Sequence, residues 1–135
     1  MLSLLLALLF CHFLADFTPL STPWMLQAKL VGRPWWPIMA HAAVHGLLMG
    51  LVLLFFTNPF QALLLAIFQT LAHFLTDLPK GRLSAAFTMF REPGQKAYWG
   101  LFGADQLCHQ VAIVAMVHHV YTVWRKSLHG ILRLR

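Results

Sequence analysis

The chain is short of charge, and above all of acidic residues. Only 10% of its 135 residues are charged and only four are Asp or Glu, whereas soluble domains carry about a quarter charged residues. Mean hydropathy is +0.68, and the runs at 2–10, 47–56 and 62–68 contain no charge. This composition excludes a disordered chain, a nucleic-acid-binding domain and an ordinary soluble enzyme. We expect one small integral membrane domain.

Cysteine is also scarce. Cys11 and Cys108 both lie in apolar segments, and two are too few for a disulfide framework. We expect each to be a small buried hydrophobic residue. The first apolar segment lacks a basic start and contains His12 and Asp16, which is unlike a cleaved signal. We therefore interpret it as a retained membrane helix.

Four apolar segments dominate what is present. They cover residues 2–17, 38–56, 60–78 and 99–124. About 20 helical residues cross the hydrocarbon core, so the first segment is short and the fourth is long. The tight connection at 57–59 makes its neighbours antiparallel. The sequence thus predicts an all-α, antiparallel four-helix membrane bundle as a single domain over 1–135. Two longer loops lie on one side, and a basic tail follows at 125–135.

Basic residues cluster outside these segments, although the formal net charge of +6 would suggest nucleic acid in a soluble protein. In membrane proteins such residues fix orientation and meet anionic lipids. The two long loops hold six, namely Lys29, Arg33, Lys80, Arg82, Arg91 and Lys96. The tail holds four, namely Arg125, Lys126, Arg133 and Arg135. This bias favours an outside N-terminus, with membrane lipids and not nucleic acid as partners.

Histidines accompany the few acids at a fixed spacing. Three of the four acids lie in apolar segments with a histidine four residues away, and the second segment carries two histidines at that spacing. The pairs are His12/Asp16, His41/His45, His73/Asp77 and Asp105/His109. Residues four apart share a helix face, and the pairs fall near segment ends on the same side of an antiparallel bundle. We expect one inward-facing polar layer beneath the two long loops.

A charge at bilayer depth costs about 2.5–3.5 kcal/mol even on lenient insertion scales. A layer of such groups therefore indicates a functional site. Imidazole and carboxylate suit a divalent metal, here zinc, manganese or iron, and bundle cores can hold two metals between facing helices. All eight residues are candidate ligands, although some acids can instead orient the histidines. Gln69, Gln106 and Gln110 are candidate supporting groups. A proton or ion path, and polar packing without metal, stay open as alternatives.

Four short motifs resemble a bacterial membrane-protein family catalogued as domain of unknown function 3307. They are His12-Phe-Leu-Ala-Asp16-Phe17, His41-Ala-Ala-Val-His45, His73-Phe-Leu-Thr-Asp77 with Lys80, and Asp105-Gln106-Leu-Cys-His109. In the family a glutamine follows the first Asp-Phe closely, whereas this chain has Leu20 there and Gln27 later. The family has no agreed activity, so the resemblance implies only the architecture, the site positions and a bacterial inner membrane. A looser similarity to small membrane-bound metal-dependent hydrolases serves as analogy.

Three functions fit this pattern. The first is a metal-dependent hydrolase acting on a lipid-borne anionic substrate, with Asp16, Asp77 or Asp105 as general base and loop cations near the head group. The second is a proton- or ion-conducting subunit, because histidine titrates near neutral pH. It needs a water path through the far half of the membrane, which is almost wholly apolar in the first three segments. The third is a non-catalytic accessory subunit of a homo-oligomer or larger membrane complex.

Overall fold

The computed structural model describes the backbone of residues 1–132 and the side chains of residues 1–126. The helices are α1 (Leu2–Phe17), α2 (Pro23–Val31), α3 (Trp35–Leu53), α4 (Pro59–Ala86), the 3-10 turn η1 (Thr88–Phe90) and α5 (Lys96–Leu132). No strand occurs in this part of the chain. The all-α class predicted from the sequence is therefore confirmed.

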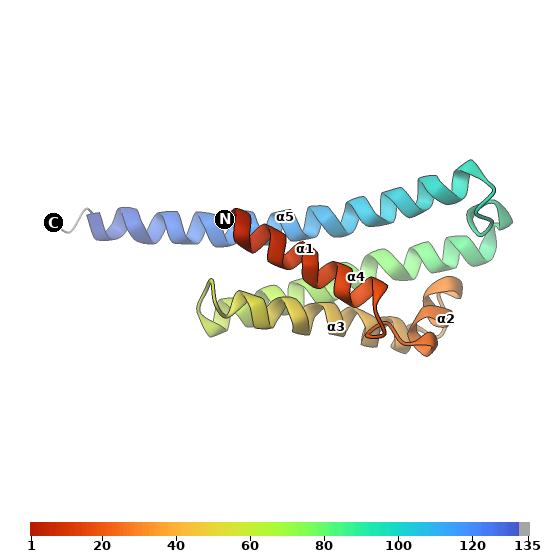
Figure 1. The fold of residues 1–135 in the computed structure, drawn as a ribbon, viewed down its shortest axis with the longest axis horizontal. Helices are drawn as coiled ribbons and strands as arrows, with labels where there is room; N and C mark the ends of the chain where they lie inside the picture. Colours follow the sequence, from red (N-terminus) through yellow and green to blue (C-terminus); the bar gives the residue numbers. More distant parts are fainter. Residues whose placement is uncertain (133–135) are drawn as a thin grey trace.

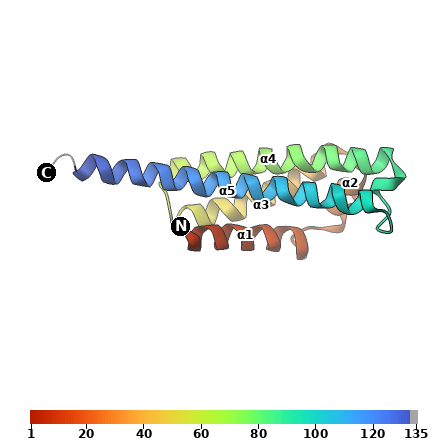
Figure 2. The same cartoon turned by 90° about the horizontal axis from the view of Figure 1, so that it is seen from above.

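The long helices lie side by side. In Figures 1 and 2, α3, α4 and α5 run along the molecule, α1 lies against one side, and α2 sits at one end. The contacts form a ring, because α1 packs on α3, α3 on α4, α4 on α5 and α5 on α1. By length and composition α3, α4 and α5 can cross a membrane, whereas α1 has 16 residues. The protein thus has three candidate spans, and four crossing helices stay a prediction.

The first long loop contains a helix that the sequence analysis did not predict. The Thr22 side chain accepts a hydrogen bond from the Met25 backbone N–H, and Pro23 starts α2. Gly32 ends α2 in the left-handed conformation, with φ of 66°. An N-cap threonine, an N1 proline and a terminal glycine are ordinary helix boundaries. The prediction of a plain loop was wrong, because these boundary residues enclose a nine-residue helix outside the four apolar segments.

Two predicted helix ends were also too early. α4 continues through Pro79 to Ala86, because α2 packs against this turn and tertiary contact outweighs the lost backbone hydrogen bond. α5 begins at Lys96 and runs to Leu132, since residues 125–132 contain no proline and continue the helix. Most of the predicted tail is thus helical, while Arg133 and Arg135 lie outside the described residues.

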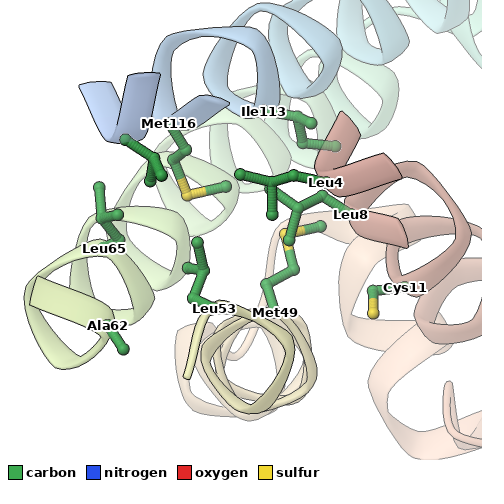
Figure 3. Packing of buried hydrophobic residues seen from close by; sticks show 10 residues of the cluster. Leu4, Leu8, Cys11, Met49, Leu53, Ala62, Leu65, Ile113 and Met116 are labelled. Carbon is green, nitrogen blue, oxygen red and sulfur yellow. The ribbon is translucent and has the colours of Figure 1, made fainter. Parts of the chain in front are cut away.

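An apolar core fills the end of the bundle away from α2. Figure 3 shows buried side chains from α1, α3, α4 and α5 converging there. They include Leu4, Leu8, Met49, Leu53, Leu65, Ile113 and Met116. Cys11 is buried as predicted, but Cys108 is exposed. The prediction for Cys108 was wrong because its neighbour His109 faces inward, and adjacent helix positions point about 100° apart.

Small residues on α3 allow α4 to approach closely. A Cβ at Gly46 would collide with the side chain of Thr70 and come within 2.7 Å of the Ala66 carbonyl oxygen. A Cβ at Gly50 would lie 2.9 Å from the Ala66 side chain. Such contacts are typical of membrane helix pairs. These glycines therefore serve helix packing.

Candidate metal centre

The four predicted pairs come together in one cluster between α1, α3, α4 and α5. Seven of the eight residues are buried, and the Asp16 side chain is only 6% exposed. The members are His12, Asp16, His41, His45, His73, Asp77, Asp105 and His109. The inward orientation expected from the four-residue spacing is thus observed.

Two sets of ligand atoms within the cluster are close enough to share a metal ion. Atoms of Asp16, His41, His45 and His73 all lie within 4.8 Å of one another. A second set of the same compactness contains His73, Asp77 and His109. His73 belongs to both, so the two sets adjoin at one imidazole. His12 and Asp105 lie outside both sets.

The imidazole rings form a stack across three helices. The ring centroids of His45 and His73 are 3.6 Å apart, and those of His73 and His109 are 4.0 Å apart. His12 lies against this stack from α1, 5.0 Å from His45 and 5.2 Å from His109. Packing of this density means that all four helices fix the positions of the rings together.

Carboxylates lie beside the rings. His41 Nε2 is 3.0 Å from Asp16 Oδ1, and His12 Nε2 is 3.4 Å from Asp16 Oδ2. His73 Nε2 is 3.2 Å from Asp77 Oδ2. The buried Ser21 hydroxyl lies 3.2 Å from His41 Nδ1 and positions that ring from its far side. Ser21 was missed in the sequence because a lone serine in a loop carries no motif.

Lys29 is the most important cluster residue that the site prediction missed. Its Nζ donates to Asp16 Oδ1 at 3.1 Å, and lies 3.0 Å from Asp77 Oδ2 and 2.9 Å from His41 Nε2. Burial disfavours the charged amine, but Asp77 and Asp16 outweigh it and raise the pKa of Lys29 above its usual value. The helix signals around α2 could have shown that Lys29 lies on a helix, but not that this helix folds back onto the bundle.

Lys80 pairs with the third carboxylate. Its Nζ donates to Asp105 Oδ2 at 2.9 Å, and Gln106 Nε2 donates to the same oxygen at 3.2 Å. Gln106 Oε1 also lies 3.5 Å from His12 Nε2, so this glutamine supports the cluster as expected. Gln110 is exposed, so its expected supporting role was wrong because it lies on the outer face of α5. The three buried acids are thus matched by two lysines.

Many buried polar atoms of the cluster have no hydrogen bond among the described residues. They include both ring nitrogens of His45 and His73, both oxygens of Asp77 and both amide atoms of the fully buried Gln69. Asp77 Oδ2 lies near Lys29, but the angles are not those of a hydrogen bond. Unpaired buried polar groups are costly. A cation with nitrogen and oxygen ligands would satisfy the imidazole and carboxylate acceptors among them, so these groups fit a borderline divalent metal.

A cavity adjoins the cluster. It has a volume of about 330 Å³ and lies between the end of α1, α2, the second half of α4, η1 and the start of α5. Asp16 and Lys29 of the cluster line it, as does Lys80. The cavity therefore reaches the cluster at Asp16 and Lys29.

These features define a helical protein with three candidate membrane spans and a buried His/Asp cluster that can hold a metal. The family model described as protein of unknown function (DUF3307) matches residues 4–133. The chain therefore belongs to this family, as its motifs predicted. No curated protein and no solved structure gives a significant match. The looser similarity to metal-dependent hydrolases has no support from these comparisons.

Proposed function

We propose that the protein is a multi-pass protein of the bacterial inner membrane that binds a divalent metal and hydrolyses a lipid-borne substrate. The observation that carries the proposal is the compact set Asp16, His41, His45 and His73, whose ligand atoms lie within 4.8 Å of one another. Three imidazoles and one carboxylate suit zinc, manganese or iron. The adjoining set with Asp77 and His109 offers room for a second ion.

When bound, such a metal supplies a Lewis acid that lowers the pKa of water and polarises an ester or phosphoester. Asp105 is the best candidate for the general base, because it lies outside both ligand sets. Its Oδ2 is held by Lys80, while its Oδ1 has no hydrogen bond in the described chain. That oxygen lies 3.5 Å from His109 Nε2, and we propose that it accepts the proton from a water at the metal.

The apolar core counts against the proton-path alternative. A conducting subunit needs polar groups or water along the whole membrane thickness. Beyond the cluster, the interior is filled by side chains such as Leu4, Met49, Leu53 and Met116, each 0–1% exposed (Figure 3). This packing supports a site that is reached from one side.

One observation favours a second candidate, a non-catalytic accessory subunit. Lys29 bridges Asp16 and Asp77, and Lys80 pairs with Asp105, so the carboxylates are partly neutralised without metal. A paired polar cluster can fix helix register. In that case, protein stripped of metal would fold and assemble with partner proteins as well as metal-loaded protein does.

A hydrolysis assay tests the proposed function. Full-length protein is stripped of metal, reloaded with zinc, manganese or iron, and placed in liposomes of mixed bacterial phospholipids. We expect metal-dependent release of a water-soluble product, reduced at least about 100-fold by Asp105→Asn. His119→Ala, on the exposed face of α5, is the matched control. Equal product release from loaded, stripped and Asp105→Asn protein would exclude the hydrolase.

A further inference from the structure

The cavity beside the cluster combines two kinds of lining. Apolar side chains form most of its wall, including Phe17, Leu30, Phe90 and Phe102. Its cationic lining comes from Lys29, Lys80 and Arg91, with Asp16 as the only acid among the lining residues. A mainly apolar pocket with a few polar groups is typical of a small-ligand site. This one is suited to an amphiphile with an anionic end.

The three cations differ in how many ion pairs and hydrogen bonds they already make within the protein. Lys29 lies between two carboxylates of the cluster. Lys80 donates to Asp105 yet its side chain stays 25% exposed, and an ammonium has three protons to donate. Arg91 donates Nε–H and one Nη–H to the Ser84 and Ala85 carbonyl oxygens, which leaves further N–H groups. Lys80 and Arg91 are thus the groups available to an anion.

Both cations lie beside the last turns of α4, Lys80 as part of that helix and Arg91 from the residue after η1. Lys80 and Ser84 are four residues apart and both line the cavity, as expected for one helix face. Arg91 is held at Ser84 by its hydrogen bond to that carbonyl. Two cations held over one helix turn match a phosphate monoester, whose charge near neutral pH is about −1.5 to −2.

Access from the lipid side is indicated by the apolar rim. Phe17 is 59% exposed and Leu30 is 69% exposed, although both line the cavity. Exposed apolar side chains at a cavity mouth are unfavourable in water but suited to acyl chains. A volume of about 330 Å³ is near the lower limit for ligand pockets. It fits a head group and the start of one chain.

We propose that this cavity binds a membrane lipid carrying a terminal phosphate monoester. The phosphate contacts Lys80 and Arg91, and the first part of an acyl chain lies against Phe17 and Leu30. The inference deepens the proposed function by naming the substrate class, and it rests on that function for turnover. Binding itself requires no metal, so the two can fail separately.

Native mass spectrometry of the full-length protein in a neutral detergent tests this inference. The probes are lysophosphatidic acid, the monoacylglycerol with the same chain, and inorganic phosphate. We expect one lysophosphatidic acid per chain, bound at least about tenfold more tightly than monoacylglycerol, the difference that one charge-assisted hydrogen bond makes. Inorganic phosphate at the same concentration should not compete, because it lacks the chain.

Charge variants locate the site. Lys80→Gln and Arg91→Gln should each weaken the binding of lysophosphatidic acid about tenfold. Arg91 contacts no carboxylate of the cluster, so Arg91→Gln keeps the test valid if Lys80→Gln fails to fold. Arg82→Gln is the matched control, because Arg82 is on α4 but lines a different cavity, with Arg33. The affinity of Arg82→Gln for lysophosphatidic acid should stay within about twofold of that of the unaltered protein.

Three results would overturn the inference: equal binding of monoacylglycerol, full competition by inorganic phosphate, or Arg91→Gln binding like Arg82→Gln. Lysophosphatidic acid binding without metal-dependent turnover would refute only the hydrolase. Metal-dependent turnover of neutral lipids alone would refute only the phosphate site.

Discussion

At the scale of single residues, His73 is the side chain on which the candidate metal centre depends most. It belongs to both sets of ligand atoms, and its ring stacks between His45 and His109. A side chain that belongs to two candidate metal positions cannot be removed without affecting both.

His73→Ala should therefore weaken metal binding by more than the 10–100-fold that is usual for residues supporting a ligand. Isothermal titration of metal-stripped protein measures this change. His119→Ala removes an exposed histidine from α5 and should bind metal as tightly as the unaltered protein. Equal metal affinity in the two variants would contradict the site.

Lys29 competes with a metal for the same carboxylates, because its ammonium contacts Asp16 and Asp77. Removing a positive charge at this distance should favour a divalent cation, so we expect Lys29→Met to bind metal at least about tenfold more tightly. Without metal, two buried carboxylates lose their partner, and the variant should be less stable by about 3–5 kcal/mol.

Lys29→Arg keeps the charge and is the control for both effects. Metal titration and thermal unfolding, each with and without metal, measure them. Weaker metal binding by Lys29→Met than by Lys29→Arg would show that Lys29 assists the metal and does not compete with it.

At the scale of elements, α2 determines where Lys29 lies. Gly32 and Gly81 allow α2 to rest directly on α4, since a Cβ at Gly81 would meet the Lys29 carbonyl oxygen and lie 2.6 Å from the Gly32 nitrogen. This contact presses the backbone of Lys29 against the same helix that carries His73 and Asp77.

Gly81→Ala tests that contact. Alanine is a better helix former than glycine by about 1 kcal/mol, yet overpacking against backbone costs about 1–3 kcal/mol. We expect a net loss of stability in thermal unfolding and a changed metal affinity, because Lys29 shifts. Gly94→Ala is the control, since nothing lies within 4 Å of a Cβ there. Equal unfolding temperatures would show that the α2–α4 contact is unimportant.

The elements also show what could be predicted from the sequence. The His/Asp spacing of four residues and the alternating helix direction were sufficient to bring His12, His41, His73 and His109 together. The positions of Lys29 and Ser21 were not predictable in this way, because they depend on how a loop folds back. The continuation of α4 through Pro79 was not predicted either, since it depends on tertiary packing that offsets the missing hydrogen bond.

At the scale of the whole molecule, the connection before α4 and the loop between α4 and α5 lie at opposite ends (Figure 1). Phe55 in the first is 87% exposed, and Gly94 in the second is exposed. The excess of Lys and Arg in the long loops predicts that the Gly94 end is cytoplasmic.

Cysteine labelling tests this orientation in a background where Cys11 and Cys108 are replaced by Ala. A membrane-impermeant maleimide should label Phe55→Cys in intact spheroplasts, and Gly94→Cys only after the membrane is opened. The reverse pattern would place the cluster near the outer face. Labelling of both positions in intact spheroplasts would contradict a membrane-crossing arrangement.

The metal content of the purified full-length protein tests the central claim most directly. After chelation, reloading with zinc, manganese or iron, and removal of free metal, elemental mass spectrometry should find about one or two ions per chain. The variant with His45 and His73 both replaced by Ala should retain almost none. If the unaltered protein holds no more metal than this variant with any of the three ions, the His/Asp cluster is not a metal centre.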